Sequence, residues 1–175
     1  MATILVGKHP SVSGSTDGGD VTFVSPFYPA DGTGLITLIH IWVPSTMTNA
    51  KIGIFGIVTP PNTMFCRSVA TVGEVLSGGE RNFVVSLSVV AGDYIGVYTG
   101  GAGQVYRYVG TAGYWRPLGD KTDGATYNFG AKTSSTRDIG LYGEGETVSV
   151  GQPYILRVQG IPGMRSFSQM GHGGL

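Results

Sequence analysis

The residues best suited to contact a ligand lie close together between positions 91 and 110, a stretch with four tyrosines and one arginine. If this stretch folds as a hairpin around the loop "GGAG", side-chain alternation places Tyr94, Tyr98 and Arg107 on one face. Gly96 then opens a slot between the two tyrosine rings, and the guanidinium lies across it. Flat aromatic area with polar tips suits protein interfaces and sugar sites alike, and Trp115 is a candidate to extend it. The alternative is that these residues only brace the hairpin.

The three histidines, His9, His40 and His172, share no spacing that predicts a metal site. His40 lies inside the apolar run "LITLIHIWV", where we expect a histidine whose ring is satisfied within the sheet rather than a ligand. The sequence contains none of the HExxH, CxxC and GxSxG patterns of zinc sites and acyl-transfer enzymes. A single cysteine, Cys66, rules out an internal disulfide. We therefore expect a protein that is not an enzyme.

Four aspartates in glycine-rich loops are candidate calcium ligands: Asp17, Asp20, Asp120 and Asp123. Oxygen ligands on such loops suit Ca²⁺, but Asp-Gly pairs are also common turn sequences. We expect no cofactor, with calcium as the alternative. Glu144 and Glu146 should lie on one side of an extended segment, whereas a glycosidase needs carboxylates on opposite sides of a sugar.

The composition excludes several classes of partner. The 11 basic and 11 acidic residues balance, and charged residues are only 13% of the chain, so the dense basic surface that nucleic acid requires is missing. No apolar run approaches the length of a membrane span. The start, "MATILVGKHP", lacks the charged and apolar regions of a signal peptide. A net charge near zero favours association, so we expect a subunit of an assembly.

Glycine, 30 residues of 175, is spread between short apolar runs, which is typical of many strands joined by turns. No window carries an apolar stripe of helical length. The pattern predicts an all-β protein, an antiparallel, jelly-roll-like β-sandwich. Its central strand should be 35–43, buried on both faces, and further strands are expected at 51–58, 63–72, 82–90 and 154–160.

We expect three parts: an N-terminal arm (1–34) with one short strand, "DVTFVS", a sandwich domain (35–160) and an extended C-terminal tail (161–175). The tail should hold neighbouring subunits through Met164, Phe167 and Met170, because burying apolar side chains against a partner is favourable. The expected core is Leu38, Ile41, Trp42, Ile54, Phe83, Val85, Ile95 and Val97.

The segment "FVVSLSVVAGDYIGVYTGG" resembles the strand–turn–strand of jelly-roll and tumour-necrosis-like β-sandwiches, in which an apolar strand runs into a glycine-aspartate turn. Similar sandwiches serve as decoration, cement and tail-appendage proteins of bacteriophages, and as carbohydrate-binding modules. The resemblance implies a sandwich and transfers no binding residue.

These observations predict a non-enzymatic structural protein of a virus or phage particle, a capsid decoration or tail-associated subunit. It would be made in the host cytoplasm, reside in the virion and contact copies of itself or other virion proteins, with no nucleic acid or membrane as partner. The first alternative is a carbohydrate-binding module that contacts surface glycans through Tyr94, Tyr98, Arg107 and Trp115. The second is an extracellular filament subunit that donates a strand to its neighbour.

Overall fold

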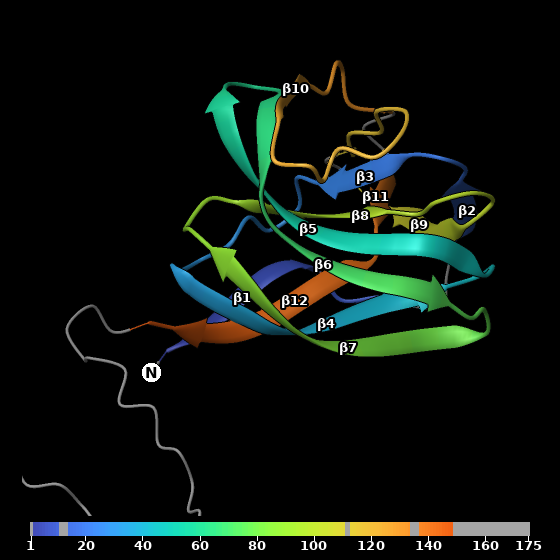
Figure 1. Cartoon of the computed structure of the whole chain (residues 1–175), viewed down its shortest axis with the longest axis horizontal. Helices are drawn as coiled ribbons and strands as arrows, with labels where there is room; N and C mark the ends of the chain where they lie inside the picture. Colours follow the sequence, from blue (N-terminus) through green and yellow to red (C-terminus); the bar gives the residue numbers. More distant parts are fainter. Residues whose placement is uncertain (1, 11–13, 111–112, 134–136, 149–175) are drawn as a thin grey trace, which may run out of the picture.

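The computed structural model describes residues 2–10, 14–110, 113–133 and 137–148. The described part of the chain is all-β, without a helix, and its two main antiparallel sheets pack face to face (Figure 1). The expected β-sandwich is therefore confirmed. The final expected strand, 154–160, and the tail with Met164, Phe167 and Met170 lie outside the described residues.

The described residues form three sheets. In order across each sheet, the first contains β1 (Thr3–Lys8), β12 (Leu141–Thr147), β4 (Gly34–Val43) and β7 (Gly79–Val89). The second contains β10 (Thr126–Asn128), β6 (Thr63–Val75), β5 (Met47–Thr59), β8 (Tyr94–Tyr98) and β3 (Thr22–Ser25). A small third sheet contains β11 (Arg137–Ile139), β9 (Gln104–Val109) and β2 (Ser15–Gly18).

The order of the strands is that of a jelly roll. Counting only β1, β3, β4, β5, β6, β7, β8 and β12, in chain order as one to eight, the first sheet runs 1-8-3-6 and the second 5-4-7-2. Each sheet thus alternates strands from the two halves of the chain, as two nested Greek keys require. Figure 1 shows β4, β7 and β12 in the lower layer, with β5, β8 and β3 above them.

Period-two alternation places one face of each sheet in the core. In β4, Ile36, Ile39, Ile41 and Val43 are at most 2% exposed, and they pack against residues of the second sheet such as Ile54. Of the expected core, Ile41, Ile54, Ile95 and Val97 are buried, while Phe83 and Val85 are half-buried and pack against the core.

The expectation that strand 35–43 is buried on both faces is wrong. Leu38, His40 and Trp42 alternate with the buried isoleucines and lie half-buried on the outer side. Burial on both faces is found instead in the second sheet, in all four residues of β3 and in residues 52–56 of β5. The second face of β5 packs in a smaller cluster with Trp115 and Phe129, which belong to the long segment 113–133.

The expectation of a separate N-terminal arm with one strand is also wrong. Residues 1–34 supply three strands, β1, β2 and β3, one to each sheet. Strand β1 pairs with β12 from Thr3 to Lys8, and its Ile4 and Val6 are fully buried. The short run "TILVG" alternates buried and exposed residues, so its apolar positions can enter the core.

Residues 92–110 do not form the expected hairpin. Strand β8 pairs with β3 on one side and β5 on the other, whereas β9 pairs with β2 and β11. Since β8 has a partner on each side, no free side remains for β9. The segment that connects β8 to β9 is instead bound to the turn between β2 and β3. There the Thr99 hydroxyl donates a hydrogen bond to the Gly19 carbonyl oxygen at 2.6 Å.

Candidate functional site

The candidate functional surface is the outer face of the four-stranded sheet, meaning the side chains of β1, β12, β4 and β7 that point away from the second sheet. One row crosses all four strands through Leu5, Glu144, Leu38 and Val84. Val84 is 90% exposed and Leu5 39%. Three apolar side chains therefore flank one carboxylate on an open surface.

Next to this row, two histidines and two carboxylates from neighbouring rows of the outer face come together. His40 of β4 lies opposite Tyr142, with its Nδ1 3.0 Å from Glu80 Oε1 and its Nε2 3.7 Å from Glu144 Oε1. His9, just past the end of β1, has its Nε2 3.9 Å from the same Glu80 oxygen. The two imidazole centroids are 5.2 Å apart, and the Tyr142 ring contacts both. These groups form a polar cluster at the end of the outer face.

A hollow of about 320 Å³ adjoins this cluster at the edge of β1, and its lining includes Tyr28, Asp31, Lys8 and Tyr142. Segment 28–31 closes the edge of the strand, since Tyr28 O accepts a hydrogen bond from Gly7 N at 2.8 Å. Tyr28 is 63% exposed and has a φ of 53°, a conformation uncommon for a residue with a side chain. The volume of the hollow is at the lower end of the range for small-ligand pockets.

The predicted tyrosine slot is not formed. Tyr94 and Tyr98 share one face of β8 as expected, but the Tyr94 ring packs on Trp115, which is only 3% exposed. The Tyr98 hydroxyl donates a hydrogen bond to Asp20 at 2.5 Å. That bond, with burial and the charge of Asp20, raises the pKa of Tyr98 to about 12. Trp115 is therefore a core residue.

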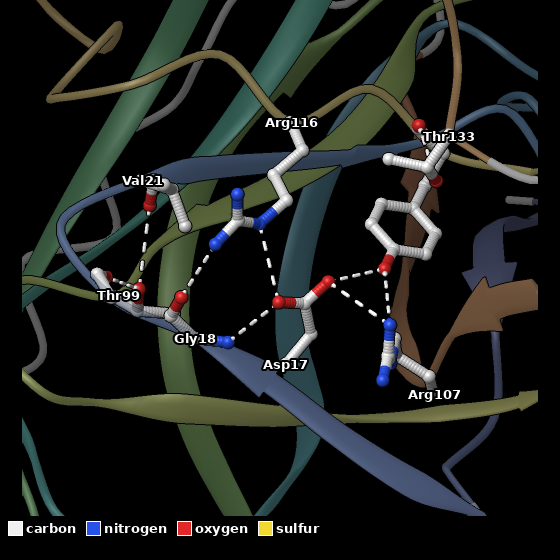
Figure 2. A network of polar contacts seen from close by, with 9 residues as sticks. Asp17, Gly18, Val21, Thr99, Arg107, Arg116 and Thr133 are labelled. Atoms are coloured by element: carbon white, nitrogen blue, oxygen red, sulfur yellow. Dashed lines mark hydrogen bonds and ion pairs between the residues drawn. The ribbon is translucent and has the colours of Figure 1, made fainter.

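Arg107 belongs to a different network, centred on Asp17 (Figure 2). Its Nη1 lies 3.4 Å from Asp17 Oδ2, and Arg116 Nε lies 3.2 Å from Asp17 Oδ1. The Tyr114 hydroxyl donates to the same carboxylate, and both burial and this bond raise the pKa of Tyr114. Because Arg107 lies in the third sheet, it braces that sheet against segment 113–133 and does not lie across Gly96.

The four candidate calcium ligands all accept hydrogen bonds from other residues. The partners of Asp17 and Asp20 are given above. Asp120 forms an ion pair with Lys51 at 2.6 Å, and Asp123 accepts a hydrogen bond from the Tyr127 hydroxyl. Burial alone would raise the pKa of Asp120, but hydrogen bonds from Lys51 and Thr122 lower it overall. Among the described residues, the group of His, Cys, Asp and Glu placed to share an ion is His9, His40 and Glu80.

Sequence reasoning missed this histidine cluster and the hollow. The position of His40 between Ile39 and Ile41 is compatible with the outer face, and Glu144 and Glu146 do lie on one side of β12, as expected. The proximity of Glu80 depends on how β4 pairs with β7, a register that no short-range pattern reveals.

No family model matches the chain, and neither the search of curated proteins nor that of solved structures found a match. In the described part of the chain, no helix has the length and apolar character needed to cross a membrane.

Proposed function

We propose that the protein is a non-enzymatic structural subunit of a virus or phage particle, which contacts its neighbours through the outer face of the four-stranded sheet. The observation that carries the proposal is the row Leu5, Leu38 and Val84 on this outer face, where Val84 is 90% exposed and Leu5 39%. Single exposed apolar residues are ordinary, but three apolar side chains in one row, on β1, β4 and β7, are typical of an interaction surface.

The contrast between the two sheets supports this choice. The five-stranded sheet is covered on both sides, by the first sheet and by segment 113–133, and β5 is buried on both faces. On the outer side of the four-stranded sheet, Trp42 at the end of β4 packs against Tyr106 of β9, but Val84 is almost fully exposed and Leu5 is 39% exposed. A rigid sheet with one open, partly apolar face can dock flat against another protein without rearrangement.

The fold adds support by analogy only. Jelly rolls are found in viral capsid and lectin domains, among others, so the architecture suits a virion subunit without selecting one. The balanced charge, 11 basic against 11 acidic residues, also favours close packing of many copies.

The test is the native mass of the full chain by light scattering over a range of concentrations. We expect the wild type to form a discrete oligomer that Val84→Lys reduces to monomer, because a lysine there would have to be buried at the interface. Val109→Lys is the matched control, since Val109 is 83% exposed but lies in the third sheet. A chain truncated after residue 160 should also fold and fail to assemble. A monomeric wild type at every concentration, or equal effects of the two lysines, would contradict self-association through this face.

Glycan binding is the second candidate, moved from the tyrosine face to the hollow beside β1. Tyr28 and Tyr142 supply aromatic rings there, and Lys8 and Asp31 supply polar groups. This function predicts a monomer that binds glycan in a screen and loses binding in Tyr28→Ala, while Tyr98→Ala still binds. Glycan binding unchanged in Tyr28→Ala would exclude the hollow.

A further inference from the structure

We propose that His9, His40 and Glu80 bind a divalent transition-metal ion, Zn²⁺ by preference, on the outer face of the four-stranded sheet. Sequence spacing separates these residues, and the fold brings them together from the end of β1, the middle of β4 and the start of β7. The proposal stands apart from the assembly function, because binding a metal ion does not require a second copy of the chain.

The three donor atoms have the separations that a metal site needs. His40 Nδ1 and His9 Nε2 lie 3.0 and 3.9 Å from Glu80 Oε1, and all three ligand atoms lie within 4.8 Å of one another. Ligands at 2.0–2.2 Å from a tetrahedral zinc are about 3.3–3.6 Å apart. Small side-chain rotations therefore suffice. His9, whose Nδ1 lies 3.1 Å from the Pro10 carbonyl oxygen, is 57% exposed and has the most room to adjust.

The surroundings of His40 place a carboxylate near its second nitrogen, at a distance that a small movement would shorten to a hydrogen bond. Its second ring nitrogen, Nε2, faces Glu144 Oε1 at 3.7 Å, so one nitrogen points to the candidate ion and the other to a carboxylate. A carboxylate on the far nitrogen fixes the tautomer of a metal-bound imidazole and raises its basicity. The Tyr142 ring, 5.7 Å from His40 and 5.2 Å from His9, packs against both imidazoles and limits their rotation.

The donor set selects the class of ion. Two imidazoles and one carboxylate suit zinc and its first-row neighbours, whereas calcium and magnesium prefer an all-oxygen set. Because His9 is exposed, the remaining coordination position opens to solvent, where water can complete a tetrahedron.

The test is a calorimetric titration of the full, tag-free chain with Zn²⁺, together with the visible absorption of the Co²⁺ form. We expect one ion per chain and the intense cobalt bands of a four-coordinate site. Glu144→Gln should weaken zinc affinity by roughly 10–100-fold, the usual effect of removing an outer carboxylate partner. His9→Ala and His40→Ala should weaken it further. His9 is the decisive variant, because it lies past the end of β1 and its loss leaves the core intact.

Two matched controls guard against adventitious binding. His172→Ala removes the third histidine of the chain, and Glu146→Gln removes the exposed carboxylate next along the outer face of β12. Both should bind zinc like the wild type. A wild-type chain that does not bind zinc, binding unchanged in His9→Ala, or binding lost in His172→Ala would overturn the proposal.

Discussion

At the scale of single residues, several polar side chains of the described chain are held by specific partners. Asp93, 4% exposed in the turn before β8, accepts two bonds from Arg67, at 2.7 and 3.2 Å, and one from Val90 N. Bidentate pairs of this kind fix geometry as well as adding energy. The aromatic residues that the sequence predicted as a binding face also have partners within the chain. The Tyr98 hydroxyl donates a hydrogen bond to Asp20, and the Tyr94 ring packs on Trp115.

The Tyr98–Asp20 bond predicts a pH dependence. The pKa of Tyr98 is raised from 10.0 to about 12, chiefly by its hydrogen bond to Asp20, so the fold favours the neutral phenol. Its stabilising contribution is complete below pH 10 and is lost as the pH rises to about 12. We expect Tyr98→Phe to lose less stability than the wild type across this window, measured by urea unfolding at each pH.

The titration of Tyr98 can be followed directly by NMR of ¹³Cζ-labelled tyrosine. Asp20→Asn should move its midpoint down toward 10, because the accepting carboxylate and its charge are gone. A wild-type midpoint already near 10 would show that the bond does not hold in solution.

At the scale of strands, alternation and turn sequences predicted most elements but not their partners. The runs 35–43, 51–58, 63–72 and 82–90 lie within β4 to β7, apart from one residue past the end of β7. Alternation cannot tell whether a strand pairs with the next one in the chain, so the hairpin at 92–110 and the slot built on it were wrong. The His9–His40–Glu80 cluster was missed for the same reason, since it depends on the register of the four strands β1, β12, β4 and β7.

Segment 113–133 should behave as part of the core. Val24 and Trp115 exchange backbone hydrogen bonds at 3.0 and 3.1 Å, so the segment extends the sheet beyond β3. Trp115→Ala should lower the free energy of unfolding by about 3–5 kcal/mol, the usual effect of emptying a large aromatic site. Leu118→Ala, in the same segment but at a residue 75% exposed, should change it by less than about 0.5 kcal/mol. Equal effects in urea unfolding would mean that the segment does not pack there.

At the scale of the whole molecule, the unequal covering of the two sheets is the main feature. The larger cluster fills the space between the sheets, and the smaller one, which includes Phe55, Cys66 and Trp115, lies under segment 113–133. Segment 113–133 covers the outer side of the five-stranded sheet. The outer side of the four-stranded sheet stays largely open, with Val84 90% exposed. The surface proposed for assembly and the cluster proposed for zinc both lie on this open side.

The single cysteine reports whether the covered side opens. Cys66 is 6% exposed, and burial raises the pKa of its thiol to about 11, so little thiolate is present at neutral pH. We expect a thiol reagent to label the native protein only at the rate of unfolding, and to label one thiol per chain at once in denaturant. Trp115→Ala should speed native labelling. Rapid labelling of the stable wild type would show that segment 113–133 opens on its own.

The pairing of β1 with β12 has a mechanical consequence. Ala2 and Thr147 lie side by side at the end of this pair, joined by bonds from Ala2 N to Thr147 Oγ1 at 3.0 Å and from Thr147 N to Ala2 O at 2.9 Å. A force that pulls these two residues apart acts along the hydrogen bonds and loads them one at a time from that end. The sandwich should therefore unzip at low force when stretched from these points, while a load spread over its sheet faces meets many bonds at once.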